Sequence, residues 1–459
     1  MAFPVTWAEV AAWLPLDAGA PMPACPLTDI VIDSRAVVPG ALFVALRGER
    51  FDGHDFLPQA QALGAGAALV SRRNPDIDLP QWTVPDTLAG LQQMGQAMRA
   101  RFTGPVAAIT GSSGKTTTRA LLVAILSEKG AVHQPERNFN NHVGVPLTLL
   151  GLRDEHDMAV CELGCSDFGE IAALADLVNP DVALVTNVGP AHLEKLGDLD
   201  GVARAKGELW AQLRKDAAVA INLDDPRVVR MPTRARRRIA YSAVKQEADV
   251  VLRYRQAVPE GQQLVIDVSG DYVDVLLPLH GRHNATNAVA AAAAAILMGA
   301  STEEIQRGLA RVQPAPGRMV SRQNAQGLWI IDDTYNANPA SVAAALHTLA
   351  ELQNTGRKVA VLGEMRELGP QAAQAHREVG ALVASLGLDA LIAVGEAGAQ
   401  LVAGAVASGM ASERCYPVAD QRAAAIIASE ISESGDVLLI KGSRGAQMEI
   451  AVAGLTASE

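Results

Sequence analysis

Cysteine is scarce in this sequence, and basic side chains are fewer than acidic ones. Only four cysteines occur in 459 residues, and 50 Asp and Glu outnumber 39 Lys and Arg, for a formal net charge of −11. A chain this acidic is not expected to bind nucleic acid or an anionic membrane broadly, because both are negatively charged. Any phosphate must therefore be bound by a local arrangement of residues. Four dispersed cysteines are typical of a reducing compartment.

Long hydrophobic runs and a secretory leader are also missing. The N-terminal stretch MAFPVTWAEVAAWLPLD lacks the basic start and the long apolar core of a signal peptide. The most apolar run, residues 288–300, is shorter than the roughly 20 residues that a membrane-spanning helix needs. We therefore expect a cytoplasmic protein without membrane insertion, and a buried helix at 288–300. The sequence does not determine the oligomeric state, and we expect a monomer.

The cysteines Cys161 and Cys165 are the only two that lie close together. Their spacing falls inside an apolar, strand-like run. We interpret them as small buried hydrophobic residues rather than as a metal or redox pair.

Apolar strands alternate with helical stretches along most of the chain, which predicts an α/β fold with mostly parallel sheets covered on both faces. At roughly 150 residues per domain, the length suggests about three domains. We expect a small α/β domain at 1–83, a central doubly wound domain at 84–313 and a C-terminal Rossmann-like domain at 314–459. Within the central domain, residues 250–279 alternate like antiparallel strands. The Pro- and Gly-rich segment 312–318 is the expected linker and hinge.

The stretch ITGSSGKTTT at 109–118 predicts a phosphate-binding loop, which makes the central domain P-loop-ATPase-like. It follows an apolar strand and opens a helix, the context in which backbone N–H groups bind an anion. Gly111 and Gly114 let the backbone turn around a phosphate, Lys115 adds a positive charge, and the Thr116 hydroxyl suits Mg²⁺. Ile109 stands where the usual motif has its first glycine, so a glycine-rich turn with an incidental lysine is the alternative.

Candidate metal ligands follow two other strands of the same predicted sheet. Glu162 ends the strand-like run in VCELG, and His192 comes just after VTNVG. Ligands of open α/β sheets lie beyond the carboxyl ends of strands, so these side chains are expected beside the loop. Each could also be an ordinary solvated loop residue. From the sequence alone, we interpret Lys206 as a surface helix lysine.

Three further polar clusters are candidates for substrate contact. RNFNNHVGVPLTLL at 137–150 holds three asparagines in a predicted loop, and GRHNATNAV at 281–289 places His283, Asn284 and Asn287 at a helix start. The asparagines either cap that helix or recognise a base. In the third domain, polar residues follow the strands of IIDDTYNANPASV, VLGEMRELG and LIKGSRG, which indicates one ligand-binding face.

With these motifs, the sequence resembles the Mur ligases, a family of ATP-dependent amide ligases of peptidoglycan precursor synthesis. The family's loop is Thr-Gly-x-x-Gly-Lys-Thr, which Thr110 to Thr116 match, and this accounts for the missing glycine at 109. The resemblance covers nearly the whole chain. DDTYNANPAS and LGEMRELG are similar to the branch that adds D-alanyl-D-alanine to UDP-MurNAc-tripeptide, and no Asp-Asn-Pro-Arg tetrapeptide of the preceding enzyme occurs. The resemblance thus implies an acyl phosphate intermediate and the products UDP-MurNAc-pentapeptide, ADP and phosphate.

The resemblance also implies roles for individual residues. Two Mg²⁺ ions would be held by Thr116, Glu162, His192 and a carbamylated Lys206. The residues expected to act in catalysis are Lys115, Asn141, His192 and Lys206. ATP would contact Gly111, Ser112, Ser113, Gly114, Lys115, Thr116, Thr117, Asn284, Asn287, Arg318 and Asp332. The UDP end of the substrate would contact Ser34 and Arg35. The D-alanyl-D-alanine side would be formed by Asp333, Tyr335, Asn336, Asn338, Lys441, Ser443 and Arg444.

Two positions depart from the family pattern. His142 stands where an acidic residue usually follows Asn141, and Cys165-Ser166-Asp167 replaces the common Ala-Asn-His. The alternatives are another Mur-type or folylpolyglutamate-type ligase, and a P-loop switch or motor protein that hydrolyses ATP without a small amine substrate. The sequence leaves open whether diaminopimelate or lysine is third in the tripeptide.

Overall fold

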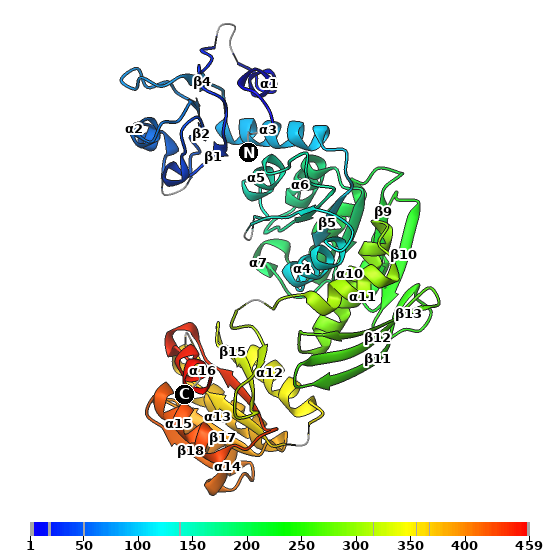
Figure 1. Ribbon diagram of the computed structural model, residues 1–459, viewed down its shortest axis with the longest axis vertical. Coiled ribbons are helices and arrows are strands. Elements are labelled where there is room, and N and C mark those ends of the chain that lie inside the picture. The colour runs from blue at the N-terminus through cyan, green and yellow to red at the C-terminus, as the bar shows by residue number, and fades with distance from the viewer. Residues whose placement is uncertain are drawn as a thin grey trace. The chain divides into compact units, whose positions relative to one another are not determined.

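The computed structural model describes residues 4–16, 20–48, 51–136, 139–314, 316–354, 356–366 and 368–456. Helices and strands alternate along these residues, and most of the strand pairs are parallel (Figure 1). The predicted α/β class with mostly parallel sheets is therefore confirmed. No helix in these ranges is both long and apolar enough to cross a membrane.

The chain divides into two compact units. The first consists of Met1–Tyr241 and Ala290–Ser301, and the second of Ser242–Val289 and Thr302–Glu459. This division follows spatial contacts and does not test the three predicted domain boundaries, which stay predictions together with the hinge at 312–318.

A small parallel sheet opens the first unit. Its strands, in spatial order, are β1 (Ile30–Val31), β2 (Leu42–Val44), β3 (Ala67–Val70) and β4 (Gln81–Thr83). Alternate side chains enter two cores, because successive residues of a strand point to opposite faces: Leu42 and Val44 join one cluster, and Phe43 joins the other. Helix α1 (Trp7–Ala12) covers the first face and α2 (Leu57–Ala62) the second.

A larger parallel sheet follows in the first unit. Its strands, in spatial order, are β10 (Arg237–Ser242), β9 (Ala218–Asn222), β8 (Val182–Val185), β5 (Val106–Thr110), β7 (Met158–Glu162) and β6 (Val132–His133). The strand that precedes the predicted phosphate loop, β5, lies between β7 and β8. The segments that follow these three strands therefore meet at one edge of the sheet.

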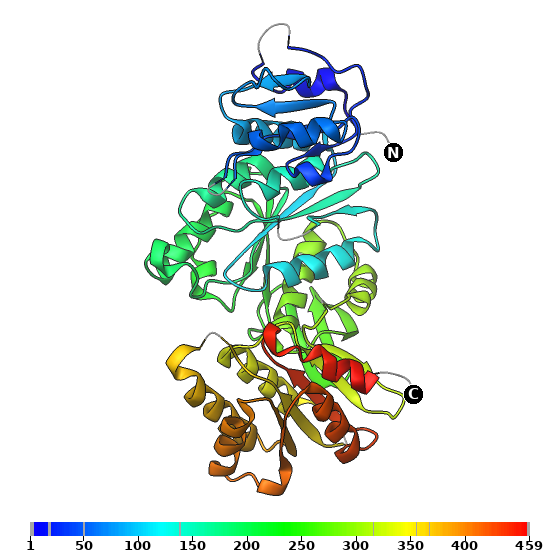
Figure 2. The ribbon, with the colours of Figure 1, turned by 90° about the vertical axis from the view of Figure 1, so that its left-hand side faces the viewer.

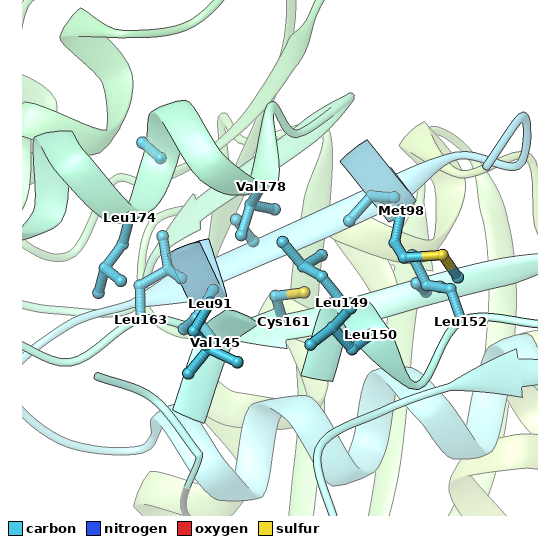
Figure 3. Packing of buried hydrophobic residues seen from close by; sticks show 14 of the residues in the cluster. Leu91, Met98, Val145, Leu149, Leu150, Leu152, Cys161, Leu163, Leu174 and Val178 are labelled. Atoms are coloured by element: carbon cyan, nitrogen blue, oxygen red, sulfur yellow. The ribbon is translucent and has the colours of Figure 1, made fainter. Parts of the chain in front are cut away.

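Helices cover this sheet and bury its central strands. They are α3 (Thr87–Arg101), α4 (Lys115–Leu126), α5 (Gly144–Leu150), α6 (Glu170–Val178), α7 (Leu193–Leu196), α8 (Leu199–Ala211) and α9 (Pro226–Val229). Figure 3 shows Leu91 and Met98 of α3 beside Leu149 of α5 and Cys161 of β7. Burial in this apolar core raises the pKa of Cys161 to about 12, so the prediction of a small buried hydrophobic residue is confirmed there.

The second unit begins with an antiparallel meander, as the alternating pattern at 250–279 predicts. Its strands are β11 (Val250–Val258), β12 (Gly261–Val268) and β13 (Asp271–Leu277). Helix α10 (Arg282–Leu297) follows, and from Ala290 on it belongs to the first unit. Its alanine-rich stretch is almost fully buried, which confirms the buried helix expected at 288–300. Helix α11 (Thr302–Arg311) comes next in the second unit.

The rest of the second unit is a six-stranded sheet. Its strands, in spatial order, are β14 (Val320–Gln323), β15 (Trp329–Asp333), β19 (Val437–Lys441), β16 (Lys358–Leu362), β17 (Ala390–Val394) and β18 (Cys415–Val418). Only β14 runs antiparallel to its neighbour. The polar segments predicted from IIDDTYNANPASV, VLGEMRELG and LIKGSRG follow β15, β16 and β19, three neighbouring strands of this sheet.

Helices lie on both faces of this sheet (Figure 2). One face is covered by α12 (Pro339–Glu351), α13 (Ala372–Ser385) and α14 (Gly398–Ala407), and the other by α15 (Gln421–Ile431) and α16 (Glu449–Thr456). Adjacent residues serve opposite faces, as Ile331 and Ile330 show by joining different clusters. The doubly wound arrangement predicted for this segment is therefore present.

Candidate active site

The predicted phosphate loop connects β5 to α4, as the sequence predicts. Gly111 has φ +146° and Gly114 has φ +78°, conformations that favour glycine. A Cβ atom at Gly111 would lie 1.9 Å from Oγ1 of Thr186, so no side chain fits there. Helix α4 begins at Lys115, directly after the left-handed Gly114, and its first N–H groups face the loop. This is the geometry of an anion-binding strand–loop–helix.

The segment after β8 holds the loop in place. Oγ1 of Thr186 donates to the carbonyl of Ser113 at 2.6 Å, and the Ser112 N–H donates to the carbonyl of Asn187 at 3.0 Å. The Ser112 hydroxyl donates to the carbonyl of Gly189 at 2.9 Å. Hydrogen bonds to the neighbouring strand end therefore fix the shape of the loop.

The Lys115 side chain folds back over this loop. Its Nζ donates to the carbonyl of Gly111 at 2.7 Å. Burial lowers the pKa of Lys115, and the nearby positive charge of Lys206 lowers it further, whereas Glu162 acts in the opposite direction. A cation beside the loop can neutralise the negative charge of a phosphoryl group.

Glu162 ends β7 and lies beside the loop, as predicted. Its carboxylate is buried, at 2% exposed, and accepts hydrogen bonds from the Thr116 hydroxyl at 3.0 Å and from Nδ2 of Asn140 at 3.0 Å. Nη1 of Arg119 lies 3.8 Å from the Glu162 carboxylate. The interpretation of Glu162 as a solvated loop acid is therefore wrong.

His192 lies in the loop after β8, on the other side of β5 from Glu162. It is exposed and has φ +51°, a left-handed conformation that is uncommon outside glycine. Its carbonyl accepts from the N–H groups of Lys195 and Leu196, so the turn places His192 just before α7. The sequence places it at the predicted sheet edge, and its role as a metal ligand stays a prediction.

Lys206 is not a surface lysine. It lies on α8 and is only 2% exposed, and its Nζ donates a 2.9 Å hydrogen bond to Sγ of Cys165. Within the part of the chain that the structure describes, no carboxylate forms an ion pair with it. A buried ammonium without an opposite charge is unfavourable. The interpretation of an ordinary helix lysine is therefore wrong, whereas carbamylation is not tested.

The oxygen donors beside the loop suit a hard cation. The Thr116 hydroxyl and the Glu162 carboxylate are 3.0 Å apart, and Mg²⁺ prefers such ligands. Among the described residues, no three His, Cys, Asp or Glu side chains gather into a metal-binding group. The predicted set of Thr116, Glu162, His192 and Lys206 contains only two such side chains and stays a prediction.

The asparagine loop contributes a residue that the sequence analysis did not select. Asn140, rather than Asn141, contacts Glu162. The Asn141 Oδ1 atom accepts from the N–H groups of Val143 and Gly144 and so stabilises the start of α5. Arg137 and Asn138 of the same motif lie outside the described residues. Three asparagines within four positions gave no signal for which one would face the carboxylate.

The two residues expected at the UDP end lie in the turn after β1. The Ser34 hydroxyl donates to Oε1 of Gln59 at 2.8 Å, whereas the Arg35 side chain is 81% exposed and pairs with Asp33 at 2.7 Å. Hydrogen bonds from Arg35 lower the pKa of Asp33 to about 2.

In the second unit, Asn284 and Asn287 contact each other near the start of α10. Nδ2 of Asn287 donates to Oδ1 of Asn284 at 3.1 Å, and Nδ2 of Asn284 donates to the carbonyl of His280 at 2.8 Å. Neither caps the helix, which already begins at Arg282. The helix-capping interpretation is therefore wrong, and base recognition stays a prediction.

The strand end of β15 carries the densest polar cluster of the second unit. Asp332 accepts from the N–H and hydroxyl of Thr334, whereas Asp333 pairs with the buried Lys441 at 2.6 Å. Burial raises the pKa of Asp333, although Lys441 opposes that shift. Nζ of Lys441 also donates to the carbonyl of Asn336 at 2.8 Å, which ties the strand end to the following loop.

The other residues expected on this face have mixed environments. The Arg318 guanidinium lies 4.3 Å from the ring centroid of the half-exposed Tyr335. Asn338 caps α12 and accepts from the Ser341 N–H at 2.8 Å, a structural role that the sequence analysis did not foresee. Arg444 lies 3.6 Å from Glu449. The Ser443 hydroxyl is buried without a hydrogen-bond partner among the described residues.

Three family models match successive segments of the chain. "Mur ligase family, catalytic domain" matches residues 26–101, "Mur ligase middle domain" matches 109–295 and "Mur ligase, glutamate ligase domain" matches 317–444. These segments follow each other in the order of the three predicted domains.

Relatives and solved structures match nearly the whole length. A UDP-N-acetylmuramoyl-tripeptide–D-alanyl-D-alanine ligase of Escherichia coli is 40% identical over 431 residues, which cover 94% of each chain. A crystal structure of MurF from Acinetobacter baumannii has a TM-score of 0.84 and 34% identity, with 99% of both chains covered. MurF ligase from Thermotoga maritima in complex with ADP has a TM-score of 0.73 and 28% identity, with 93% of this chain and 97% of that chain covered.

Proposed function

This chain belongs to the Mur ligase family, and we propose that it joins D-alanyl-D-alanine to UDP-MurNAc-tripeptide with the use of ATP. The single structural observation that carries the ATP-dependent part is the glycine loop between β5 and α4, with Lys115 over it and the Thr116–Glu162 pair beside it. The choice of substrates rests on the relatives, which are ligases of this pair of substrates.

The reaction must first make the tripeptide carboxylate a better acyl donor. Transfer of the γ-phosphoryl group of ATP to that carboxylate gives an acyl phosphate, whose phosphate leaves readily when the dipeptide amine attacks. The products are UDP-MurNAc-pentapeptide, ADP and phosphate. The protein contributes positioning and stabilisation of charge. When Lys115 turns from the Gly111 carbonyl to a phosphoryl oxygen, it exchanges a neutral acceptor for a charged and stronger one.

Mg²⁺ fits the oxygen donors at the end of β7. Thr116 and Glu162 would hold it, and His192 would approach from the loop after β8. Bound Mg²⁺ would neutralise phosphoryl oxygens. Glu162 is held by Asn140 on its other oxygen, so its carboxylate already has a fixed orientation. We propose two ions here, as the family resemblance implies.

A carbamate on Lys206 fits the environment of its nitrogen. The ammonium is buried beside a thiol and near the charge of Lys115. Addition of CO₂ to the neutral amine would remove a buried positive charge and create an anion with two oxygens. Such an anion suits Mg²⁺ and would attract the Lys115 ammonium. The proposed role is to orient a metal ion, not to take part in bond making.

The remaining site residues are assigned by the family resemblance. We propose that Ser34 and Arg35 contact the UDP group and that Asn141 lies near the reacting carboxylate. The contacts to ATP would be completed by Ser112, Ser113, Thr117, Asn284, Asn287, Arg318 and Asp332. The dipeptide would be bound on the side of Asp333, Tyr335, Asn336, Asn338, Lys441, Ser443 and Arg444.

Phosphate release measured with purified UDP-tripeptides, each with and without D-alanyl-D-alanine, tests this function. We expect release only when ATP, Mg²⁺, a UDP-tripeptide and the dipeptide are all present. Release without any amine would instead support a switch or motor protein. Release with glutamate and a folate in place of these substrates would support a folylpolyglutamate-type ligase.

A further inference from the structure

Cys165 and Lys206 form a pair of nucleophilic groups, of which the proposed reaction uses only Lys206. They lie 41 positions apart in the sequence, yet the Lys206 Nζ to Cys165 Sγ distance is 2.9 Å. Both side chains are buried, at 7% and 2% exposed. Cys165 lies in the segment after β7, and Lys206 lies on helix α8.

The surroundings of Cys165 differ from those of Cys161. Cys161 lies in an apolar core and is 1% exposed, the environment of an inert structural thiol. Cys165 instead contacts the Lys206 nitrogen at 2.9 Å. A basic side chain next to a cysteine favours reaction at its sulfur. Two cysteines only four positions apart in the sequence therefore have different neighbours.

We propose that Cys165 and Lys206 are a redox modification site, at which a hydroperoxide joins Sγ to Nζ by a reversible covalent bond. In the first step the thiol attacks the peroxide, the O–O bond breaks, and sulfenic acid and an alcohol or water form. Sulfur is oxidised by two electrons and the peroxide is reduced by two. Sulfenic acids condense with a backbone nitrogen to give a sulfenamide, and we extend this reaction to the Lys206 nitrogen at 2.9 Å. In the second step the neutral Lys206 amine attacks sulfur, the S–O bond breaks, and water leaves with one amine proton.

The bond would stop ligation, a consequence that rests on the proposed function. The nitrogen that is bonded to sulfur cannot also carry CO₂, so the cross-link and the carbamate exclude each other. An external dithiol would cleave the S–N bond and return both the thiol and the amine. The cross-link itself needs only the pair of side chains and an oxidant, so it can be tested apart from ligase activity.

Mass spectrometry of the digested full-length protein tests the site directly. The protein is treated with hydrogen peroxide at several bicarbonate concentrations, quenched by alkylation of free thiols and digested. We expect a pair of peptides containing Cys165 and Lys206, joined, and lighter than their sum by two hydrogen atoms. Dithiothreitol should remove it, and rising bicarbonate should lower its yield because carbamylation occupies the amine.

Matched variants identify which cysteine sulfur forms the bond. Cys161→Ser should keep the cross-link, whereas Cys165→Ser and Cys165→Ala should each lose it; the two replacements guard against a folding defect in one. Absence of the joined peptides in the wild-type protein, under conditions in which the exposed Cys25 is oxidised, would overturn the proposal. A joined pair that retains an oxygen atom would overturn the condensation step. A cross-link whose yield does not change with bicarbonate concentration would support the modification site and count against the carbamate.

Discussion

The Thr116 hydroxyl donates a 3.0 Å hydrogen bond to the Glu162 carboxylate across 46 positions of sequence. This contact joins the start of α4 to the end of β7, and it exists because β5 and β7 are neighbours in a parallel sheet. A hydroxyl and a carboxylate in this position are prepared for a hard cation.

Glu162→Gln should raise the Mg²⁺ concentration needed for half-maximal phosphate release and lower kcat/KM by about 10²-fold. The amide keeps the shape of the side chain but removes the charge that a cation requires. Rates measured against MgCl₂ concentration check this, with Glu155→Gln as an exposed control. An unchanged Mg²⁺ dependence would remove Glu162 from the metal site.

Lys115→Ala should lower kcat by about 10²–10³-fold, by analogy with the loss of one preorganised charge-stabilising donor. The side chain lies over the loop, with Nζ 2.7 Å from the Gly111 carbonyl, where it would neutralise a bound phosphoryl group. Lys129→Ala, an exposed residue just after α4, is the matched control. Full activity of the Lys115 variant would contradict the assignment of the loop.

Lys206→Ala should lose most of the ligase activity, and short carboxylic acids should restore part of it. The variant leaves a space beside Cys165 that a small carboxylate can fill, and its oxygens replace those of the carbamate. Initial rates with and without acetate measure the effect, and the exposed Lys215→Ala serves as control. Normal activity of the Lys206 variant would return this residue to a packing role.

Gly111→Ala should destabilise the protein by about 1–3 kcal/mol and weaken ATP binding, because the loop must move. The added Cβ would lie 1.9 Å from Thr186 Oγ1, at a φ of +146°. Gly169→Ala is a fitting comparison, since its φ is +81° but no atom lies within 4 Å of an added Cβ. Thermal unfolding and ATP titration are measured for both variants. A larger loss of stability in Gly111→Ala than in Gly169→Ala would come from the contact with Thr186. Equal losses of stability would show that Thr186 moves away from the added Cβ.

Stability should fall between pH 6.5 and pH 4, in part because of His280. This side chain is 1% exposed, and burial lowers its pKa to about 4, so the unfolded chain takes up a proton at a higher pH than the folded protein does. The contribution is fully present above pH 6.5 and is lost as pH falls, by up to about 3 kcal/mol.

Urea unfolding at pH 7.5 and pH 5 measures this dependence. His280→Leu should reduce the difference in unfolding free energy between the two pH values, and the exposed His142→Gln should leave it unchanged. An identical difference in the His280 variant and the wild type would show that other groups carry the effect.

The phosphate loop could be predicted from the sequence because its chemistry is local. Gly111, Gly114, Lys115 and Thr116 are adjacent, and their strand and helix flank them directly. Edge strands were harder to see. Strands β4, β6, β14 and β18 all lie at sheet edges and are short, and β18 contains Pro417. An edge strand needs neither a long apolar run nor a full set of backbone donors, so its signal is weak.

Burial of Lys206 was missed although a signal exists. Val202, Ala205, Leu209 and Trp210 are buried on α8 at helical spacing, and Lys206 falls within that stripe. The sequence interpretation placed Lys206 at the surface because of its charge, although its position in the stripe indicates burial. The contact with Cys165 could not be predicted, because it depends on how the segment after β7 turns towards another helix.

The hydrogen bonds from Thr186, Ser112 and Asn187 also bear on the speed of nucleotide capture. A flexible loop has to lose conformational entropy when it closes on a phosphate, whereas this loop loses that entropy when the protein folds. If the loop binds nucleotide as proposed, we expect binding on first encounter, and differences in affinity among related nucleotides should arise mainly from how long each one stays bound.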